Sequence, residues 1–179
     1  MHRSFRPLGL VLAFLFSFSL AAQSEQGIQW MSIEEAQKAA QKEPRPVVID
    51  VYTDWCGWCK KMDAATFQHP GIAQYVNENF YAVKLDGEER DSITFRGQSY
   101  GYVPRGRRGY HELPAQLLKG KLSYPTVVFL DPQLKLIQPI PGYQGPKNFE
   151  TIITYMGEGH YKTQPFKQYR TNYDHSLVQ

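Results

Sequence analysis

The chain has two cysteines, Cys56 and Cys59, and only two residues separate them, within the segment DWCGWCK. Three kinds of chemistry use such a pair: a structural disulfide, half of a zinc site, or a redox-active dithiol. A disulfide across so few residues closes almost no loop, and the entropic stabilisation grows with loop length. A purely structural disulfide is therefore a poor explanation for the pair.

A zinc site is also a poor explanation. Structural zinc normally has four ligands. The chain has no second cysteine pair, and its central and C-terminal histidines occur singly, without the spacing of metal ligands: His69, His111, His160 and His175. We therefore expect no metal at this site, which leaves the redox-active dithiol.

The residues around the pair predict how it is positioned. The run VVIDVY, residues 47–52, is continuous and β-branched, as in a strand buried on both faces. The segment GWCKKMDAATF after Cys56 predicts a helix, which places Cys56 at a helix N-terminus. Unpaired N–H groups and the helix dipole favour an anion there, so we expect a lowered pKa for Cys56 and a reactive thiolate. Cys59 lies one turn further on, where it can attack a mixed disulfide and release the product.

The remaining elements follow in the order expected of one α/β domain. An edge strand is expected at 28–31, and a capping box formed by Ser32 and Glu35 opens a helix that ends before Pro44. A second helical piece begins near Pro70. Further strands are expected at 80–86, 125–131 and 134–140, and a last helix at 146–156. Residues 87–120 have no core-strand pattern; they predict a hairpin that turns at Arg96-Gly97, a loop and a short helix.

Two motifs give the chain a resemblance to a known family. With DWCGWCK at 54–60 and YPT at 124–126, residues 28–157 resemble the thioredoxin superfamily, closest to secreted or periplasmic thioredoxin-like proteins with a CGWC active site. The resemblance implies an α/β thioredoxin fold, in which helices flank a central mixed sheet. Residues 87–120 would be an insertion before the strand that begins with a cis-proline. Pro125 matches that proline, which faces the cysteines and shapes the substrate groove.

The resemblance also implies a proton acceptor for the second cysteine. Asp50 stands six residues before Cys56, where the family has a buried carboxylate beneath the resolving cysteine. Burial raises the pKa of a carboxyl group, so Asp50 can exchange protons near neutral pH and take the proton of Cys59. Lys84, in the facing strand, resembles the lysine that pairs with this acid. An alternative for Asp50 is a surface position at a strand edge, which its apolar neighbours disfavour.

Five residues are candidates for the substrate groove: Trp55, Gly57, Trp58, Tyr124 and Thr126. The two tryptophans could instead be core aromatics. Gly57-Trp58 replaces the Gly-Pro of thioredoxins, so their strongly reducing potential is not carried over. The insertion could reach the rim of this site.

Two further groups of residues, an arginine cluster and the tyrosines of the tail, lie outside the candidate site. Arg105, Arg107 and Arg108 form a basic cluster among glycines, which is either a solvated loop or a docking surface. The tyrosines of the tail are expected to pack on the domain: Tyr161, Tyr169 and Tyr173.

The N-terminus has the layout of a secretory signal peptide. Arg3 and Arg6 precede an uncharged apolar run over 8–20, which is shorter than the roughly 20 residues of a membrane-spanning helix. Small residues predict cleavage after Ala21, with Ala22 as the alternative. We therefore expect a signal peptide at 1–21 and a single mature domain at 22–179, with a tail at 158–179.

The charge of the mature chain excludes one class of partner. Without Arg3 and Arg6 the 20 basic residues fall to 18, against 17 acidic ones. Such a near-neutral chain gives no electrostatic reason to bind nucleic acid.

These observations predict an exported thiol–disulfide oxidoreductase that acts on protein or peptide thiols and disulfides through Cys56 and Cys59. The reducing direction is favoured, with a membrane redox partner that keeps the pair as thiols. No organic cofactor is expected, because the sulfur pair carries the electrons. The alternative is a non-catalytic binding module that uses the groove and the insertion to hold a partner.

Overall fold

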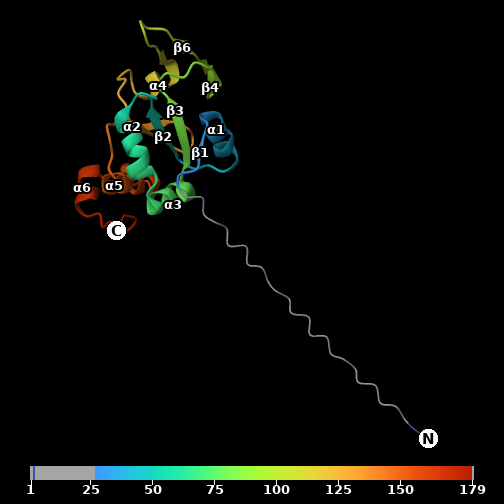
Figure 1. Cartoon of the computed structure of the whole chain (residues 1–179). Helices are drawn as coiled ribbons and strands as arrows, with labels where there is room; N and C mark the ends of the chain where they lie inside the picture. The colour runs from blue at the N-terminus through green and yellow to red at the C-terminus, as the bar shows by residue number, and fades with distance from the viewer. Residues whose placement is uncertain (1, 3–26, 179) are drawn as a thin grey trace.

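The computed structural model describes residue 2 and residues 27–178 (Figure 1). The predicted signal peptide, residues 1–21, lies outside the described residues apart from His2. In the described part of the chain, no helix has both the length and the apolar character to cross a membrane.

A five-stranded mixed sheet forms the centre of the fold, in the order β1-β3-β2-β8-β9. β1, β3 and β2 run parallel, whereas β8 and β9 are antiparallel to their neighbours. The edge strand expected at 28–31 is present as β1. The strands are β1 Trp30–Met31, β2 Val47–Tyr52, β3 Tyr81–Asp86, β8 Thr126–Leu130 and β9 Leu136–Pro141.

Helices cover both faces of this sheet. The capping box at the start of α1 is confirmed, because Ser32 accepts from the N–H of Glu35 and Glu35 accepts from that of Ser32. The helix predicted after Cys56 is α-helical only as far as Met62 and continues as a π-helical turn, η1, a distinction that helix propensity does not make. The helices are α1 Ile33–Lys42, α2 Gly57–Met62, η1 Asp63–Phe67, α3 Pro70–Asn79 and α5 Pro146–Gly157.

The alternation of side chains along β2 decides which residues lie beneath the cysteines. Val47 and Ile49 pack in the cluster that includes α1, whereas Val48 packs in the cluster that includes α2, α3 and α5. Successive side chains of a strand point to opposite faces. Asp50 therefore points to the same face as Val48, the face that α2 covers.

The insertion forms two small sheets of its own. The predicted turn at Arg96-Gly97 is confirmed, with φ values of 52° and 79° as in tight hairpin turns. These strands do not join the five-stranded sheet, and they lie at the end where α2 begins (Figure 1). The N–H of His111 donates to the carbonyl of Gly87 over 2.8 Å and ties the insertion to the end of β3. Its elements are β4 Ile93–Phe95, β5 Gln98–Tyr100, β6 Tyr102–Val103, β7 Tyr110–His111 and α4 Glu112–Leu117.

The tail contains two helical pieces that the sequence analysis did not predict, η2 His160–Lys162 and α6 Phe166–Thr171. The predicted packing of the tail is confirmed for Tyr161 and Tyr169, which contact the core between the sheet and α5. Tyr173 packs on Tyr169 with ring centroids 5.3 Å apart.

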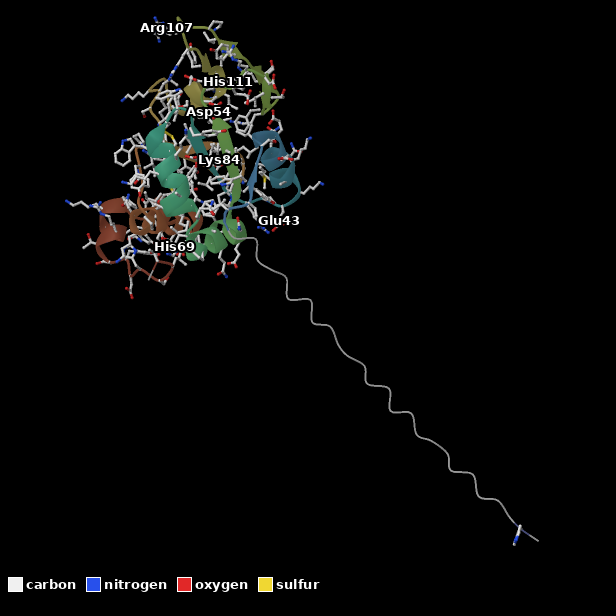
Figure 2. All side chains as sticks on the ribbon, in the orientation of Figure 1. Glu43, Asp54, His69, Lys84, Arg107 and His111 are labelled. Atoms are coloured by element: carbon white, nitrogen blue, oxygen red, sulfur yellow. A yellow bond between two sulfur atoms is a disulfide. The ribbon has the colours of Figure 1, made fainter. Side chains whose placement is uncertain are left out.

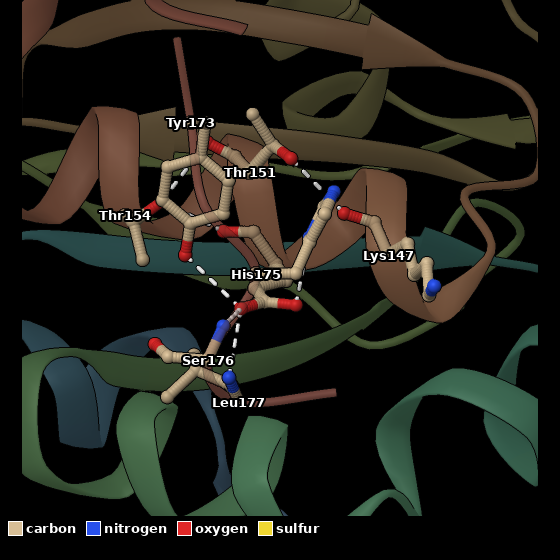
Figure 3. A network of polar contacts seen from close by, with 8 residues as sticks. Lys147, Thr151, Thr154, Tyr173, His175, Ser176 and Leu177 are labelled. Carbon is tan, nitrogen blue, oxygen red and sulfur yellow. Dashed lines mark hydrogen bonds and ion pairs between the residues drawn. The ribbon is translucent and has the colours of Figure 1, made fainter. Parts of the chain in front are cut away.

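A buried carboxylate anchors the end of the tail (Figure 3). Glu150 of α5 is fully buried and accepts hydrogen bonds from the N–H groups of Ser176 and Leu177 at 2.7 and 2.8 Å. It also accepts from the Tyr173 hydroxyl at 3.1 Å and contacts the His175 ring at 3.0 Å. Burial alone would raise the pKa of Glu150, but these hydrogen bonds outweigh burial and lower it.

Replacing Glu150 by glutamine is expected to lower the free energy of unfolding by about 1–3 kcal/mol at pH 7, because buried donors lose their acceptor. Because the pKa of the folded state is lowered, this stabilisation is present above the ordinary carboxyl pKa and is lost as the pH falls through the lowered value. Urea denaturation at pH 7 and pH 3 measures both effects. The exposed Glu78→Gln is the control, and an equal loss in both variants would contradict the assignment.

Candidate redox active site

The two cysteines form a disulfide at the start of α2, with their Cα atoms 5.3 Å apart. Cys56 is the N-cap of the helix, and its sulfur accepts a hydrogen bond from the N–H of Cys59 over 3.1 Å. Both side chains are buried, with exposed fractions of 5% for Cys56 and 2% for Cys59. An N–H aimed at the sulfur of a helix N-cap is the kind of donor that favours a thiolate at that position, and Cys56 is the more exposed of the two residues.

Asp50 is buried in β2, on the face that α2 covers. Its Oδ2 accepts from the Lys84 ammonium over 2.7 Å, across the register pair that β2 and β3 form at these residues. Its Oδ1 is buried and has no hydrogen-bond partner among the described residues. Burial raises the pKa of Asp50 to about 6, and Lys84 limits the rise. The structure thus contains a buried acid that titrates near neutral pH and has a free oxygen.

Lys84 links this acid to the end of α2, the helix of the cysteines. Its ammonium also pairs with Asp63, the residue that follows α2, and lies 5.2 Å from the centre of the Phe67 ring. Burial disfavours the charge on Lys84, but the two carboxylates outweigh burial and raise its pKa. The sequence analysis did not identify Asp63. Asp63 lies four residues, about one helical turn, after Cys59, so a search along the cysteine face of the predicted helix could have identified it.

The segment of Pro125 lies at the same end of the sheet as the cysteines. The Tyr124-Pro125 peptide is cis, and Thr126 pairs with Val51, just before the strand leads into the cysteine motif. The ring of Tyr124 packs edge-on against Trp55, with centroids 6.0 Å apart. The structure therefore brings the YPT and DWCGWCK motifs together from distant parts of the sequence.

The two tryptophans of the cysteine motif, Trp55 and Trp58, lie on the surface, so the alternative that they are core aromatics is wrong. Trp55 is 51% exposed and Trp58 is 58% exposed, and Leu122 is the only other exposed large apolar side chain among the described residues. Trp58 packs on Tyr143 at 5.5 Å and lies under the Lys61 ammonium at 4.7 Å. The disulfide is thus flanked by two solvent-accessible aromatic rings.

The insertion reaches this rim. The guanidinium of Arg108 lies 4.6 Å from the centre of the Trp55 ring, and Arg107 is at the tip of the insertion (Figure 2). Arg108 is exposed, as expected of a solvated loop, and in addition contacts Trp55. A pocket of about 320 Å³ beside it is lined by both signs of charge: Asp54, Asp86, Glu88, Glu89, Arg90, Tyr102, Arg107 and Arg108.

Replacing Arg108 by methionine is expected to release the Trp55 ring, because a cation–π contact at an exposed site contributes about 0.5–1 kcal/mol. Acrylamide quenching of tryptophan fluorescence should increase when it is measured in a background with Trp30 and Trp58 replaced by phenylalanine, which leaves Trp55 as the one tryptophan of the sequence. Arg105→Met at the same tip is the control and should leave quenching unchanged. Equal quenching in both variants would show that Arg108 does not hold the ring.

A Cys-x-x-Cys pair at the start of the helix that follows a central strand, with a cis-proline at the same end of the sheet, defines a thioredoxin-like protein. The chain belongs to the Thioredox_DsbH family, described as "Protein of unknown function, DUF255", whose model matches residues 12–156. The family match confirms the resemblance to thioredoxin-like proteins that the two motifs indicated. The domain limits drawn from the sequence remain predictions.

Two curated relatives match part of the chain. Protein B0495.5 of Caenorhabditis elegans, described as uncharacterized, is 28% identical over 125 residues, which are 67% of this chain and 15% of that protein. The thiol:disulfide interchange protein DsbD of Pectobacterium atrosepticum is 25% identical over 127 residues, which are 68% of this chain and 18% of DsbD. The chain thus spans less than a fifth of the length of either relative.

A solved structure shows the same fold. The structure of a DsbH oxidoreductase has a TM-score of 0.51 and 18% sequence identity, and the match covers 77% of this chain and 87% of that one. The predicted thioredoxin fold is therefore confirmed.

Proposed function

We propose that this protein is an exported thiol–disulfide oxidoreductase that reduces disulfides in protein or peptide substrates. The observation that carries the proposal is the Cys56–Cys59 pair at the N-terminus of α2, the helix that covers the sheet face on which the buried acid Asp50 lies. Burial raises the pKa of this acid to about 6. The partial relative DsbD is a thiol:disulfide interchange protein, which supports the same reaction class.

The reaction begins with the Cys56 thiolate. It attacks one sulfur of the substrate disulfide, forms a mixed disulfide and displaces the other substrate sulfur as a thiolate. Cys59 loses its proton to Asp50, attacks Cys56 and displaces the second substrate sulfur. The pair ends as a disulfide and the substrate as two thiols, so two electrons pass from the protein to the substrate.

Substrate binding is assigned to the rim around the disulfide. An extended substrate would lie beside Tyr124, Pro125 and Thr126 and pair its backbone with that segment, as strand-adding peptides do. Trp55, with Gly57-Trp58, would contact its side chains. The exposure of both tryptophans supports this arrangement.

The cellular setting is proposed from the sequence. Cleavage of a signal peptide at 1–21 would deliver the mature chain outside the cytoplasm, in a periplasm-like compartment. The sulfur pair itself carries the electrons, so we propose that the reaction needs no organic cofactor and no metal. A membrane redox partner would return the pair to its thiol form.

Equilibration of the purified protein with glutathione or dithiothreitol buffers tests the direction of the reaction. A reductase should have a reduction potential near that of thioredoxins, about −270 mV, whereas strong oxidants lie near about −120 mV. We expect a value closer to the first. A value near the second would contradict the reducing direction while leaving disulfide exchange intact.

A further inference from the structure

A second pocket lies away from the disulfide, between β9, α5 and the tail. Its volume of about 590 Å³ is within the usual range for small-molecule sites. Side chains of β9 and α5 form its inner side, and η2 and α6 form its outer wall. The lining residues are Ile137, Gln138, Ile140, Gln144, Asn148, Ile152, Tyr155, Met156, Tyr161, Phe166 and Arg170.

The outer wall lies outside the family match. The family match ends at residue 156, and the outer lining residues Tyr161, Phe166 and Arg170 all come later. The pocket therefore combines a family core with a tail that the family model does not include.

This wall is anchored on both sides of the pocket. The Tyr155 hydroxyl donates to the carbonyl of Gln164 over 2.6 Å, and the ring of Tyr155 packs on Phe166 at 5.1 Å. Beyond α6, the buried carboxylate of Glu150 binds the tail at 173–177 (Figure 3). Because η2 and α6 are held on both sides of the pocket, they do not collapse onto the apolar side chains of β9 and α5. Apolar space that is left unfilled loses dispersion contacts. The geometry therefore favours an occupant.

The chemistry of the lining indicates the occupant. Most of the lining is aliphatic or aromatic, which suits a hydrocarbon chain. Two of the polar lining residues are already hydrogen-bonded, since Asn148 donates to Gln144 and Gln144 donates to the carbonyls of Pro141 and Gly142. The third, Gln138, is exposed.

Arg170 is the only charged residue in the lining. Its guanidinium lies 5.9 Å from the centre of the Phe166 ring, and in the part of the chain that the structure describes no carboxylate is within ion-pair distance of it. A guanidinium at the mouth of an apolar pocket complements a carboxylate.

We propose that this pocket binds a medium-chain aliphatic carboxylate, with the chain among Ile137, Ile140 and Ile152 and the head group on Arg170. The site is separate from the disulfide, so the proposal stands whether or not the protein exchanges disulfides.

Isothermal titration calorimetry of the purified protein with decanoate tests this proposal. We expect saturable binding of one decanoate per chain. Arg170→Met keeps most of the apolar stem and should weaken binding about fivefold or more, because the charged hydrogen bonds are lost. Lys167→Met, on the same helix but outside the lining, should stay within about twofold of wild type. Decyltrimethylammonium, with the opposite charge, should bind about tenfold more weakly.

A second variant tests the location. Ile140→Trp fills the pocket and should abolish decanoate binding, and the surface variant Arg170→Met remains informative if Ile140→Trp does not fold. The proposal is overturned if wild type shows no saturable binding, if Arg170→Met and Lys167→Met bind equally well, or if a folded Ile140→Trp binds decanoate like wild type.

Discussion

Replacing Cys56 by serine is expected to lower the rate of disulfide exchange by about 10³-fold or more, because the attacking thiolate is removed. The hydroxyl of serine is a far weaker nucleophile at neutral pH, and Cys59 is the more buried of the two sulfurs. Reduction of insulin by dithiothreitol, followed as turbidity, measures the rate. Thermal unfolding of the variant, compared with that of the reduced wild type, checks that the fold is retained.

The same variant separates catalysis from binding. A binding module that holds a partner through the groove and the insertion would have no insulin-reducing activity and would bind its partner equally well after Cys56→Ser. An inactive wild-type protein, or a variant as active as wild type, would therefore contradict the proposed reaction.

Replacing Asp50 by asparagine is expected to stabilise the oxidised protein at pH 8. The pKa of Asp50 rises from an ordinary value of 3.8 to about 6 on folding, mainly because of burial. A raised pKa means that the carboxyl group favours folding below its ordinary value and that this contribution is lost as the pH rises through about 6. The difference corresponds to about 3 kcal/mol at most, and the loss of the Lys84 contact reduces it.

Urea denaturation across pH 4 to pH 8 measures this effect. The gap between Asp50→Asn and wild type should grow with pH and nearly vanish at pH 4. Asp63→Asn is the matched control, since Asp63 also pairs with Lys84 but is 41% exposed and should show no such gain. A gap that does not change with pH would show that Asp50 is not a desolvated acid.

The same substitution should slow resolution of the mixed disulfide by about 10²-fold, the usual contribution of a general base. Rapid-quench measurement of product release isolates this step. An unchanged rate of release would remove Asp50 from the proposed mechanism.

Local patterns predicted the parts of the site that lie close together in the sequence. The β-branched run of β2 ends four residues before Cys56, so the strand and the helix after it fix the position of the pair. The apolar neighbours of Asp50 predicted its burial, and in-register pairing of β2 and β3 placed Lys84 beside it.

Contacts between distant segments were not predictable in this way. Arg108 lies in the loop between β6 and β7, and it contacts Trp55 because of the path that this hairpin takes. The composition of a loop does not specify such a path. The tail is similar: α6 is short, and its position depends on the contacts of Tyr155 and on the buried carboxylate of Glu150. The pocket beneath α6 therefore has no signature in the sequence.

Trapping of mixed disulfides by Cys59→Ser tests the central claim most directly. This variant retains the attacking sulfur but cannot resolve the intermediate, so a disulfide-containing protein substrate should stay covalently attached through Cys56. We predict adducts on non-reducing gels that disappear with dithiothreitol and that are absent when Cys56 is also replaced by serine. If Cys59→Ser forms no such adducts, or if the double variant forms them equally, the protein does not exchange disulfides through this pair.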